Sequence, residues 1–312
     1  MSSGPYGEPK ILVVGATGKQ GHAVIRALTR GRGEPPAFPV HVLALTRNPS
    51  SPKALALAKD RPWLELVKGN LDSRDSMRQV FIHAGGRGAV WGVFMVLPYA
   101  GLGESTEGEA VQGITLADLA MQFAVSIFVY SSVHRGETDD DSDRSLPEHA
   151  GKIATTVLRA GLKKDVKIRM VAVDDIGLLV ATLFQRPVNI AYKVMVVAGD
   201  DLTATEQDDV FRRVTGKPAP SFPHFLGSFI LAINSGLRDI TYYLDFIFRY
   251  RADNSELFEE HISNTHAVVP AAHMTSFEEW VKQYERRKRK KQTEGGGSWN
   301  RISLSKLLMG RL

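Results

Sequence analysis

A set of glycines near the start of the chain has the spacing of a phosphate-binding turn. The apolar residues 10–14 lead into Gly15, Gly18 and Gly21, and a stretch with helical apolar spacing follows. Gly15 allows a tight turn off a strand, Gly18 removes a side chain where a pyrophosphate must approach backbone N–H groups, and Gly21 allows close packing of the helix. The helix N-terminus then offers free donors and partial positive charge to the phosphates. The pattern predicts a bound dinucleotide, with a plain glycine turn as the alternative.

The end of the second expected strand indicates which dinucleotide would bind. The apolar residues 40–45 are followed by Thr46, Arg47, Asn48 and Pro49. An acidic residue at this place accepts from a free ribose 2′-hydroxyl, whereas a guanidinium binds a 2′-phosphate. Because the chain has Arg47 and no carboxylate there, we predict NADP(H) as the cofactor. A solvated surface arginine is the alternative.

The elements that would position these residues alternate between strand and helix. Stretches with helical spacing separate the buried-type apolar runs, which lie at residues 10–14, 40–45, 64–70, 89–97 and 126–132. This alternation predicts an α/β fold with a doubly wound parallel sheet of the Rossmann type. The nucleotide would lie across the carboxyl ends of the strands. There, Asp72 follows the third strand in a turn where many nucleotide folds place a residue near the adenine.

The second half of the chain predicts a small C-terminal α+β lobe. We expect strands at residues 168–173 and 192–198, and between them a helix opened by residues 174–177 with an aspartate at its cap. Further helices are expected at residues 152–162, 207–214, 225–248 and 276–284. Residues 225–248 are interpreted as amphipathic helices of the lobe, with a membrane-surface helix as the alternative.

These patterns divide the chain into four parts. Residues 9–135 form an NADP(H)-binding Rossmann domain, residues 136–167 a shortened acidic loop and helix, residues 168–285 the last sheet strands and the small lobe, and residues 286–312 a basic flexible tail. The acidic loop lacks the pattern of a calcium-binding loop, and the chain has no cysteine, so we predict no metal site. The absence of cysteine also excludes a cysteine nucleophile.

The positive charge of the chain is concentrated in its tail. Residues 286–312 have a net charge of +8, which against +5 for the whole chain leaves −3 for residues 1–285. We therefore expect no direct nucleic-acid binding by the body. The six basic residues at 286–291 have three interpretations: a nuclear-import signal, a patch for an anionic surface, or a solvated end. With no signal peptide or transmembrane segment recognised, we expect a cytoplasmic protein, and a nuclear one under the first interpretation.

Several stretches together resemble the NmrA-like family of atypical short-chain dehydrogenases/reductases. They are residues 15–21 with TRNP at 46–49, FVYSSV at 128–133, VAVDDIG at 171–177, VTGKP at 214–218 and SFEEW at 276–280. The resemblance covers roughly residues 9–285. It implies a Rossmann domain with a small C-terminal lobe that binds NADP(H).

The resemblance also implies roles for single residues. The phosphates are assigned to five residues of the glycine turn: Gly15, Thr17, Gly18, Gln20 and Gly21. The 2′-phosphate is assigned to Arg47. Leu97, at the end of the fourth strand, would run under the nicotinamide side.

The chain departs from the family pattern in its centre. In relatives, a helix that begins with lysine, a strand ending in Arg-Pro and an asparagine-bearing loop separate the Tyr-Ser-Ser strand from the VAVDDIG strand. Here one acidic loop and one helix take their place, and the Tyr-x-x-x-Lys matches at Tyr6 and Tyr284 fall outside the position that the chemistry requires. Three candidate catalytic residues are left: Lys152, which opens the helix, His149, which could donate a proton near neutral pH, and Ser132. A solvated lysine and a strand-terminating serine are the alternatives.

The phosphate-binding residues are complete while the residues that would use the nicotinamide are depleted, and this favours binding over turnover. The family includes reductases and quinone-type oxidoreductases, and also proteins that bind the nucleotide to regulate a transcription factor or another partner. We therefore expect a nucleotide-responsive, redox-sensing regulator that acts through a protein partner such as a transcription factor. The alternatives are an NADPH-dependent oxidoreductase that reduces a small carbonyl or quinone, and a truncated, inactive family member.

Overall fold

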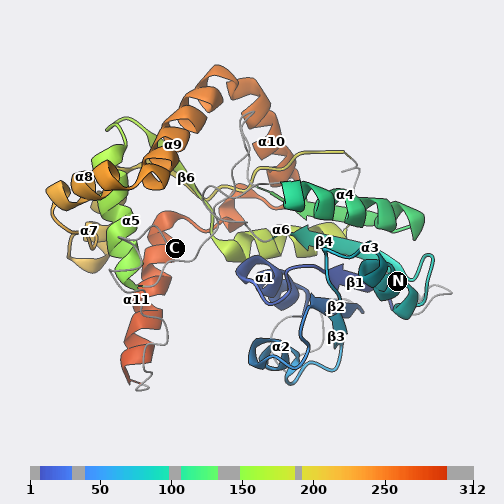
Figure 1. Cartoon of the computed structure of the whole chain (residues 1–312). Coiled ribbons are helices and arrows are strands. Elements are labelled where there is room, and N and C mark those ends of the chain that lie inside the picture. Colours follow the sequence, from blue (N-terminus) through green and yellow to red (C-terminus); the bar gives the residue numbers. More distant parts are fainter. Residues whose placement is uncertain (1–7, 30–38, 98–106, 133–147, 187–191, 294–312) are drawn as a thin grey trace.

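A five-stranded parallel sheet forms the centre of the protein (Figure 1). The computed structural model describes residues 8–29, 39–97, 107–132, 148–186 and 192–293, with only the backbone described at 107, 148–154 and 288–293. The sheet has the order β3-β2-β1-β4-β5. Its strands are β1 (Lys10–Val13), β2 (His41–Thr46), β3 (Leu64–Lys68), β4 (Val90–Val96) and β5 (Ile127–Ser131). The parallel alignment of all five brings their carboxyl ends to one edge.

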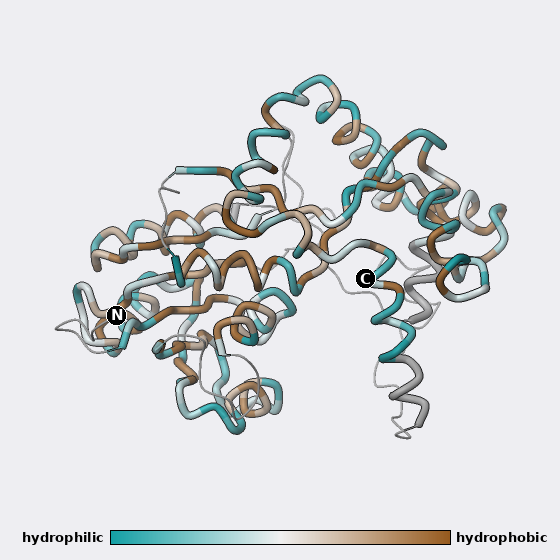
Figure 2. The backbone as a smooth tube through the Cα atoms, turned by 180° about the vertical axis from the view of Figure 1, so that it is seen from behind, coloured by the Kyte–Doolittle hydropathy of each residue, from teal (hydrophilic) through white to brown (hydrophobic). Residues whose placement is uncertain are grey.

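Helices cover both faces of this sheet. Alternate residues of β1 and the residue after it point to opposite faces: Ile11 and Val13 belong to one apolar core, and Leu12 and Val14 to the other. The first core is closed by α1 (Lys19–Leu28), α2 (Pro52–Ala58) and α6 (Val173–Gln185), and the second by α3 (Arg74–His83) and α4 (Glu107–Gln122). Figure 2 shows the apolar segments that run through this part of the chain. The predicted doubly wound parallel sheet is confirmed.

Helix α6 binds the sheet to the rest of the protein. A Cβ on Gly177 would lie 2.6 Å from the backbone oxygen of Ala23, so α6 and α1 pack at backbone distance. Asp175 is buried and accepts hydrogen bonds from the backbone N–H and the hydroxyl of Thr275, at 2.8 and 2.7 Å. The expected aspartate cap is therefore wrong. The helix begins at Val173 with Ala172 as its N-cap, and the aspartate carboxylate reaches a distant segment instead of its own helix.

The C-terminal lobe contains a second, antiparallel sheet of two strands. These are β6 (Lys167–Met170) and β7 (Asp200–Thr203), which pair with each other and not with the five-stranded sheet. The lobe helices are α5 (Glu148–Gly161), α7 (Ala204–Thr215), α8 (His224–Ile233), α9 (Ser235–Asp253), α10 (Ser255–Val268) and α11 (Phe277–Thr293), with a 3-10 turn η1 (Ala271–His273). The predicted small α+β lobe is confirmed.

The strand expected at residues 192–198 is wrong. This segment has no strand partner in the described part of the structure and is held by a helix instead. The backbone N–H of Val196 donates to the carbonyl of His261 at 3.2 Å, and the Thr265 hydroxyl donates to the Val196 carbonyl at 2.9 Å. Helix α10 thus satisfies backbone groups that a neighbouring strand would otherwise pair.

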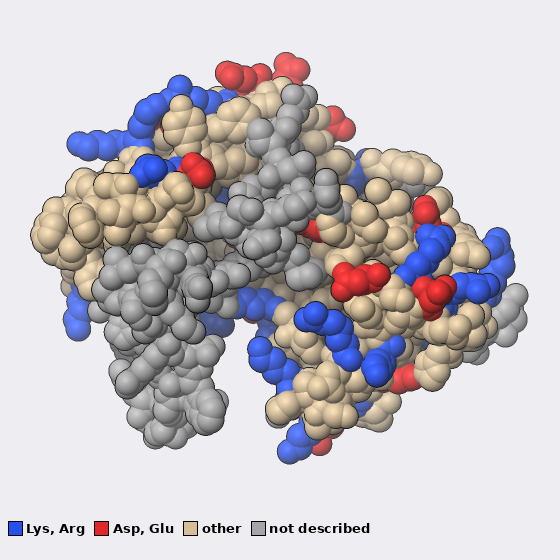
Figure 3. All heavy atoms as spheres, in the orientation of Figure 1, with Lys and Arg blue, Asp and Glu red and all other residues tan. Residues whose placement is uncertain are grey.

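Charged side chains are distributed unevenly over the surface. Figure 3 shows Lys, Arg, Asp and Glu interspersed over the sheet part, and a largely uncharged surface over α8 in the lobe. No helix in the described ranges combines the length and the apolar character needed to cross a membrane.

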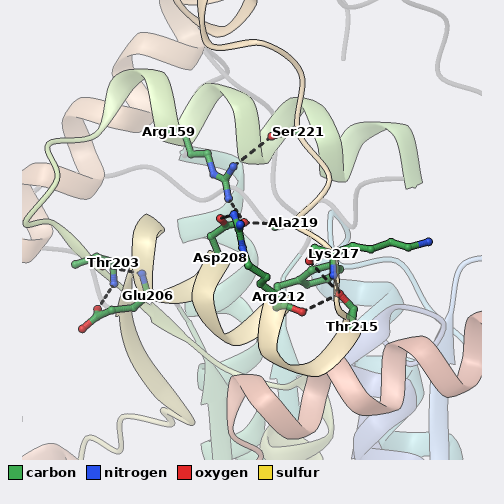
Figure 4. Close-up of polar contacts among 10 residues, drawn as sticks. Arg159, Thr203, Glu206, Asp208, Arg212, Thr215, Lys217, Ala219 and Ser221 are labelled. Carbon is green, nitrogen blue, oxygen red and sulfur yellow. Dashed lines mark hydrogen bonds and ion pairs between the residues drawn. The ribbon is translucent and has the colours of Figure 1, made fainter.

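An acidic residue in the lobe joins three segments (Figure 4). Asp208 of α7 accepts hydrogen bonds from Arg159 of α5 at 2.8 Å, from Arg212 at 3.0 Å and from the backbone N–H of Ala219 at 2.8 Å. Burial alone would raise the pKa of Asp208, but these three donors outweigh it and lower the pKa to about 2. Asp208 therefore stabilises the lobe in its ionised form.

This cluster predicts a steep loss of stability in acid. Because the pKa of Asp208 is lower in the folded than in the unfolded chain, its contribution is fully present above about pH 4 and is lost as the pH falls towards 2. We expect Asp208→Asn to lower the free energy of unfolding at pH 7 by about 1–2 kcal/mol and to flatten its pH dependence below pH 4. Urea unfolding at several pH values measures both effects. Asp209→Asn, an exposed neighbour on the same helix, is the control, and equal pH profiles for the two variants would disprove the assignment.

Candidate functional site

The glycine turn lies against the end of the neighbouring strand. Gly15 follows β1 with φ of +73°, a conformation that residues with a side chain rarely adopt. A Cβ added to it would lie 2.6 Å from Cγ1 and 3.0 Å from the backbone oxygen of Val96, the last residue of β4. The turn therefore fills the space between β1 and β4, where the strand order reverses. In open α/β sheets, ligands bind at this point.

The turn also shapes the start of α1. The backbone N–H of Gly18 donates to the Gly15 carbonyl at 2.9 Å, and Gly18 is the N-cap of the helix. A Cβ on Gly21 would lie 2.7 Å from the carbonyl carbon of Gly15 and 2.8 Å from Cα of Ala16. The closest approach at Gly21 is thus to the backbone of the turn itself.

The first turn of α1 presents free donors to solvent. The first intrahelical bond runs from His22 to Gly18, so the backbone N–H groups of Lys19, Gln20 and Gly21 have no acceptor within the helix. No acidic side chain lies in this turn, and Thr17 and Gly18 are exposed. These groups can receive an anion, and the geometry fits the pyrophosphate expected from the sequence.

Arg47 and Asp72 lie at the ends of the two adjacent strands. Arg47 follows β2, is exposed, and makes no ion pair with any acidic residue in the described part of the chain. Its guanidinium is therefore available to a ligand phosphate. Asp72 follows β3 and is exposed, and it accepts a hydrogen bond at 2.6 Å from Gln112 of α4.

Leu97 offers its backbone and not its side chain to a ligand. It follows β4 at the carboxyl edge, but its side chain is buried in the core between β4 and α4. Its Cδ1 lies 3.6 Å from the position of a Cβ on Gly113. Contact with a nicotinamide at this place would come from main-chain atoms.

A hydrogen bond that the sequence did not indicate crosses the carboxyl edge. The hydroxyl of Ser131, at the end of β5, donates to the side-chain oxygen of Gln20 at 2.6 Å. Next to it, the Tyr130 hydroxyl donates to Glu109 of α4 at 3.1 Å. The contact between Gln20 and Ser131 joins the start of α1 to β5 across the end of β4. No local pattern could have shown it, because the two residues are 111 positions apart.

The candidate catalytic residues are not brought together by the described structure. Ser132 is exposed directly after β5. His149 and Lys152 lie in α5, and their side chains are outside the described residues, as is the acidic loop around Asp139–Asp141. The backbone of α5 packs against α8 and α9 of the lobe. Among the described residues, no group of three His, Asp or Glu side chains could hold a metal ion.

A comparison with protein families identifies the N-terminal half of the chain. Residues 7–155 match the NmrA-like family, and this range contains the glycine turn, Arg47 and all five strands of the parallel sheet. Residues 7–155 belong to the NmrA-like family. The resemblance inferred from the sequence motifs is confirmed, and residues 7–155, here called the NmrA-like region, contain every candidate site residue from Gly15 to Lys152.

Solved structures share the fold of the NmrA-like region and of the lobe. The triphenylmethane reductase of Citrobacter sp. has 18% sequence identity and a TM-score of 0.59, with 89% of this chain and 99% of that chain covered. NmrA, a negative transcriptional regulator, has 14% identity and a TM-score of 0.59, with 93% and 99% covered. The NADPH-dependent quinone oxidoreductase QOR2 of Escherichia coli has 19% identity and a TM-score of 0.57, with 88% and 99% covered. At these identities the likeness establishes the fold alone.

Proposed function

We propose that this protein binds NADP(H) across the carboxyl edge of its parallel sheet. The free N–H groups at the start of α1 would hold the pyrophosphate, and Arg47 would hold the 2′-phosphate. Related structures have been solved with NADP(H), NADPH or NAD, which supports a dinucleotide here. The preference for the 2′-phosphorylated form rests on Arg47.

We propose further that the protein is a nucleotide-responsive regulator that acts through a protein partner such as a transcription factor. One observation carries this proposal: the backbone N–H groups at the start of α1 and the Arg47 guanidinium have no partner among the described residues, whereas the described polar groups at the end of β5 are engaged with other side chains. Ser131 is bonded to Gln20, and Tyr130 to Glu109. The site is prepared to bind a nucleotide more than to react with it. The likeness to NmrA, a negative transcriptional regulator, is compatible with this role.

The bond between Gln20 and Ser131 suggests how occupancy would be sensed. Gln20 belongs to the first turn of α1, which would contact the pyrophosphate. A phosphate that draws Gln20 towards itself would release Ser131 at the edge strand β5. A nucleotide can shift such an equilibrium only by binding one arrangement better than the other. We propose this exchange of hydrogen bonds as the link between nucleotide and partner surface.

A reductase is the second candidate function. In it, NADPH would supply a hydride to a carbonyl or quinone carbon, and a proton would go to the oxygen. The observation in its favour is the exposed Tyr130 at the carboxyl end of β5, whose hydroxyl could relay a proton to the product oxygen. The third candidate is a truncated and inactive family member. It would have the fold, but a nucleotide would not raise its stability.

One experiment separates the three candidates. Thermal melting of the full chain is followed with NADPH, NADP⁺ and NADH, and NADPH oxidation is assayed with a panel of quinones and aldehydes. A ligand at about 100 times its Kd stabilises by about 2.7 kcal/mol, which raises the Tm by roughly 5 °C or more. A rise with NADPH and no turnover supports the regulator, and turnover abolished in Lys152→Ala supports the reductase. The absence of any rise in Tm with all three nucleotides would contradict the proposed binding.

A further inference from the structure

Helix α8 exposes an apolar face to solvent. Phe225, Phe229 and Ile233 follow one another at a spacing of four residues, and their exposed fractions are 68%, 56% and 53%. This spacing puts them on one side of the helix. Large contiguous apolar patches on a protein surface mark binding sites, so this face is a candidate for one.

The opposite face of α8 is fixed to the lobe. A Cβ on Gly227 would lie 2.6 Å from the backbone oxygen of Thr156, so α8 packs on α5 at backbone distance. Leu231 is buried beside Thr241 of α9 and Gly161 of α5. The helix cannot rotate to bury its phenylalanines without losing this packing. This packing therefore holds the apolar face on the surface of the described structure.

The sequence from the end of α7 through α8 to the start of α9 carries basic residues and no acidic one. Residues 210–238 contain no acidic residue, and they include Lys217 before α8 and Arg238 after it. Figure 3 shows a largely uncharged surface over α8, with basic and acidic side chains beyond it. Because this stretch has no carboxylate, α8 itself would not repel an anionic surface.

A basic run lies at the same end of the molecule. Helix α11 carries Arg286 and Arg287, both exposed, and the sequence continues with four more basic residues to Lys291. Helix α11 packs on α7, and Figures 1 and 2 both place α7, α8 and α11 at the lobe end, away from the parallel sheet. The apolar face of α8 and the basic run of α11 therefore belong to the same lobe, although Figure 1 shows the C-terminal end of α11 pointing away from α8.

We propose that the lobe docks on an anionic lipid surface. The side chains of Phe225 and Phe229 would enter the interfacial region, and the basic run of α11 would supply attraction to acidic headgroups. Membrane anchoring that is stable without a spanning helix usually needs two such signals, one apolar and one basic. A second copy of the chain would cover the apolar face, but it would leave the basic run without a counter-charge. The lipid surface accounts for both features.

Sedimentation of the full chain with vesicles tests this proposal. We expect binding to vesicles of phosphatidylcholine with phosphatidylserine and at least about tenfold weaker binding to phosphatidylcholine alone. The double variant Phe225→Ser/Phe229→Ser should reduce binding to the acidic vesicles at least about tenfold, and Arg286→Glu/Arg287→Glu by a similar factor. The matched control is Val111→Ser/Ile114→Ser, which changes an equally exposed apolar pair on α4 and should leave binding intact.

Three outcomes would overturn the proposal. The first is no binding to either kind of vesicle. The second is equal binding by the α8 variant and the wild type while thermal melting shows both to be folded. The third is a concentration-dependent dimer of the wild type, detected by light scattering, that does not form in the α8 variant, together with no binding of the wild type to vesicles. The last result would assign the face to a second copy of the chain.

Discussion

Replacing Arg47 with alanine is expected to lower the affinity for NADPH about 30-fold and to leave the affinity for NADH unchanged. The guanidinium is exposed at the end of β2 and has no acidic partner in the described structure, so a 2′-phosphate is the group it would neutralise. Hydrogen bonds to charged groups contribute about 2 kcal/mol each, which corresponds to the stated factor. Titration of wild type and variant with both nucleotides measures the two affinities.

The control for this prediction is Arg78→Ala. Arg78 is an exposed arginine of α3 outside the candidate site, and its loss removes the same charge from the protein. A general electrostatic effect would weaken NADPH binding equally in both variants. If the ratio of NADPH to NADH affinity is the same in Arg47→Ala and in wild type, Arg47 does not bind the 2′-phosphate.

The second large effect is expected at Gly21. A Cβ there would lie 2.7 Å from the carbonyl carbon of Gly15 and 2.8 Å from Cα of Ala16. These are backbone atoms, which cannot move aside without breaking the turn. We expect Gly21→Ala to lower the free energy of unfolding by about 2–3 kcal/mol, as overpacking in a fixed site does, and to abolish NADPH-dependent stabilisation. Urea unfolding with and without NADPH measures both.

A matched substitution in another helix should have the opposite sign. A Cβ on Gly113 of α4 would meet only Leu97 and Met95 side chains, at 3.6 and 3.9 Å, which are ordinary contact distances. Gly113→Ala should therefore raise the free energy of unfolding by about 0.5–1 kcal/mol, the usual difference between glycine and alanine in a helix. Similar effects of the two variants would show that the turn tolerates a side chain at Gly21.

The parallel sheet could be predicted from the sequence because its signals are local. Each strand is an apolar run of about the observed length, and the runs alternate with helical patterns, so their order follows from short connections. The signal of the glycine turn is equally local, because its three glycines lie within seven residues. The sequence did not show that this turn packs against the end of β4. The close approach of Gly15 to Val96 in the structure shows it.

The lobe was less predictable because distant contacts decide its details. Residues 192–198 have the apolar pattern of a strand, but the carbonyl of His261 and the hydroxyl of Thr265 take up backbone groups of Val196. Asp175 has the type and place of a helix cap, yet its carboxylate accepts hydrogen bonds from Thr275, 100 positions later. Neither contact can be predicted from the residues that neighbour it in the sequence. The same is true of the contact between Gln20 and Ser131.

The route of the chain through α6 has a consequence for the protein as a whole. The strands on either side of α6 in the sequence, β6 and β7, belong to the lobe, whereas α6 itself is packed against α1 and the parallel sheet. The chain therefore passes from the lobe to the sheet and back. Asp175 of α6 accepts a hydrogen bond from Thr275, which lies in the segment before α11. Neither part can be excised as a continuous piece without removing an element of the other. We therefore expect the sheet part and the lobe to unfold together, and a nucleotide bound at the glycine turn to raise the stability of both.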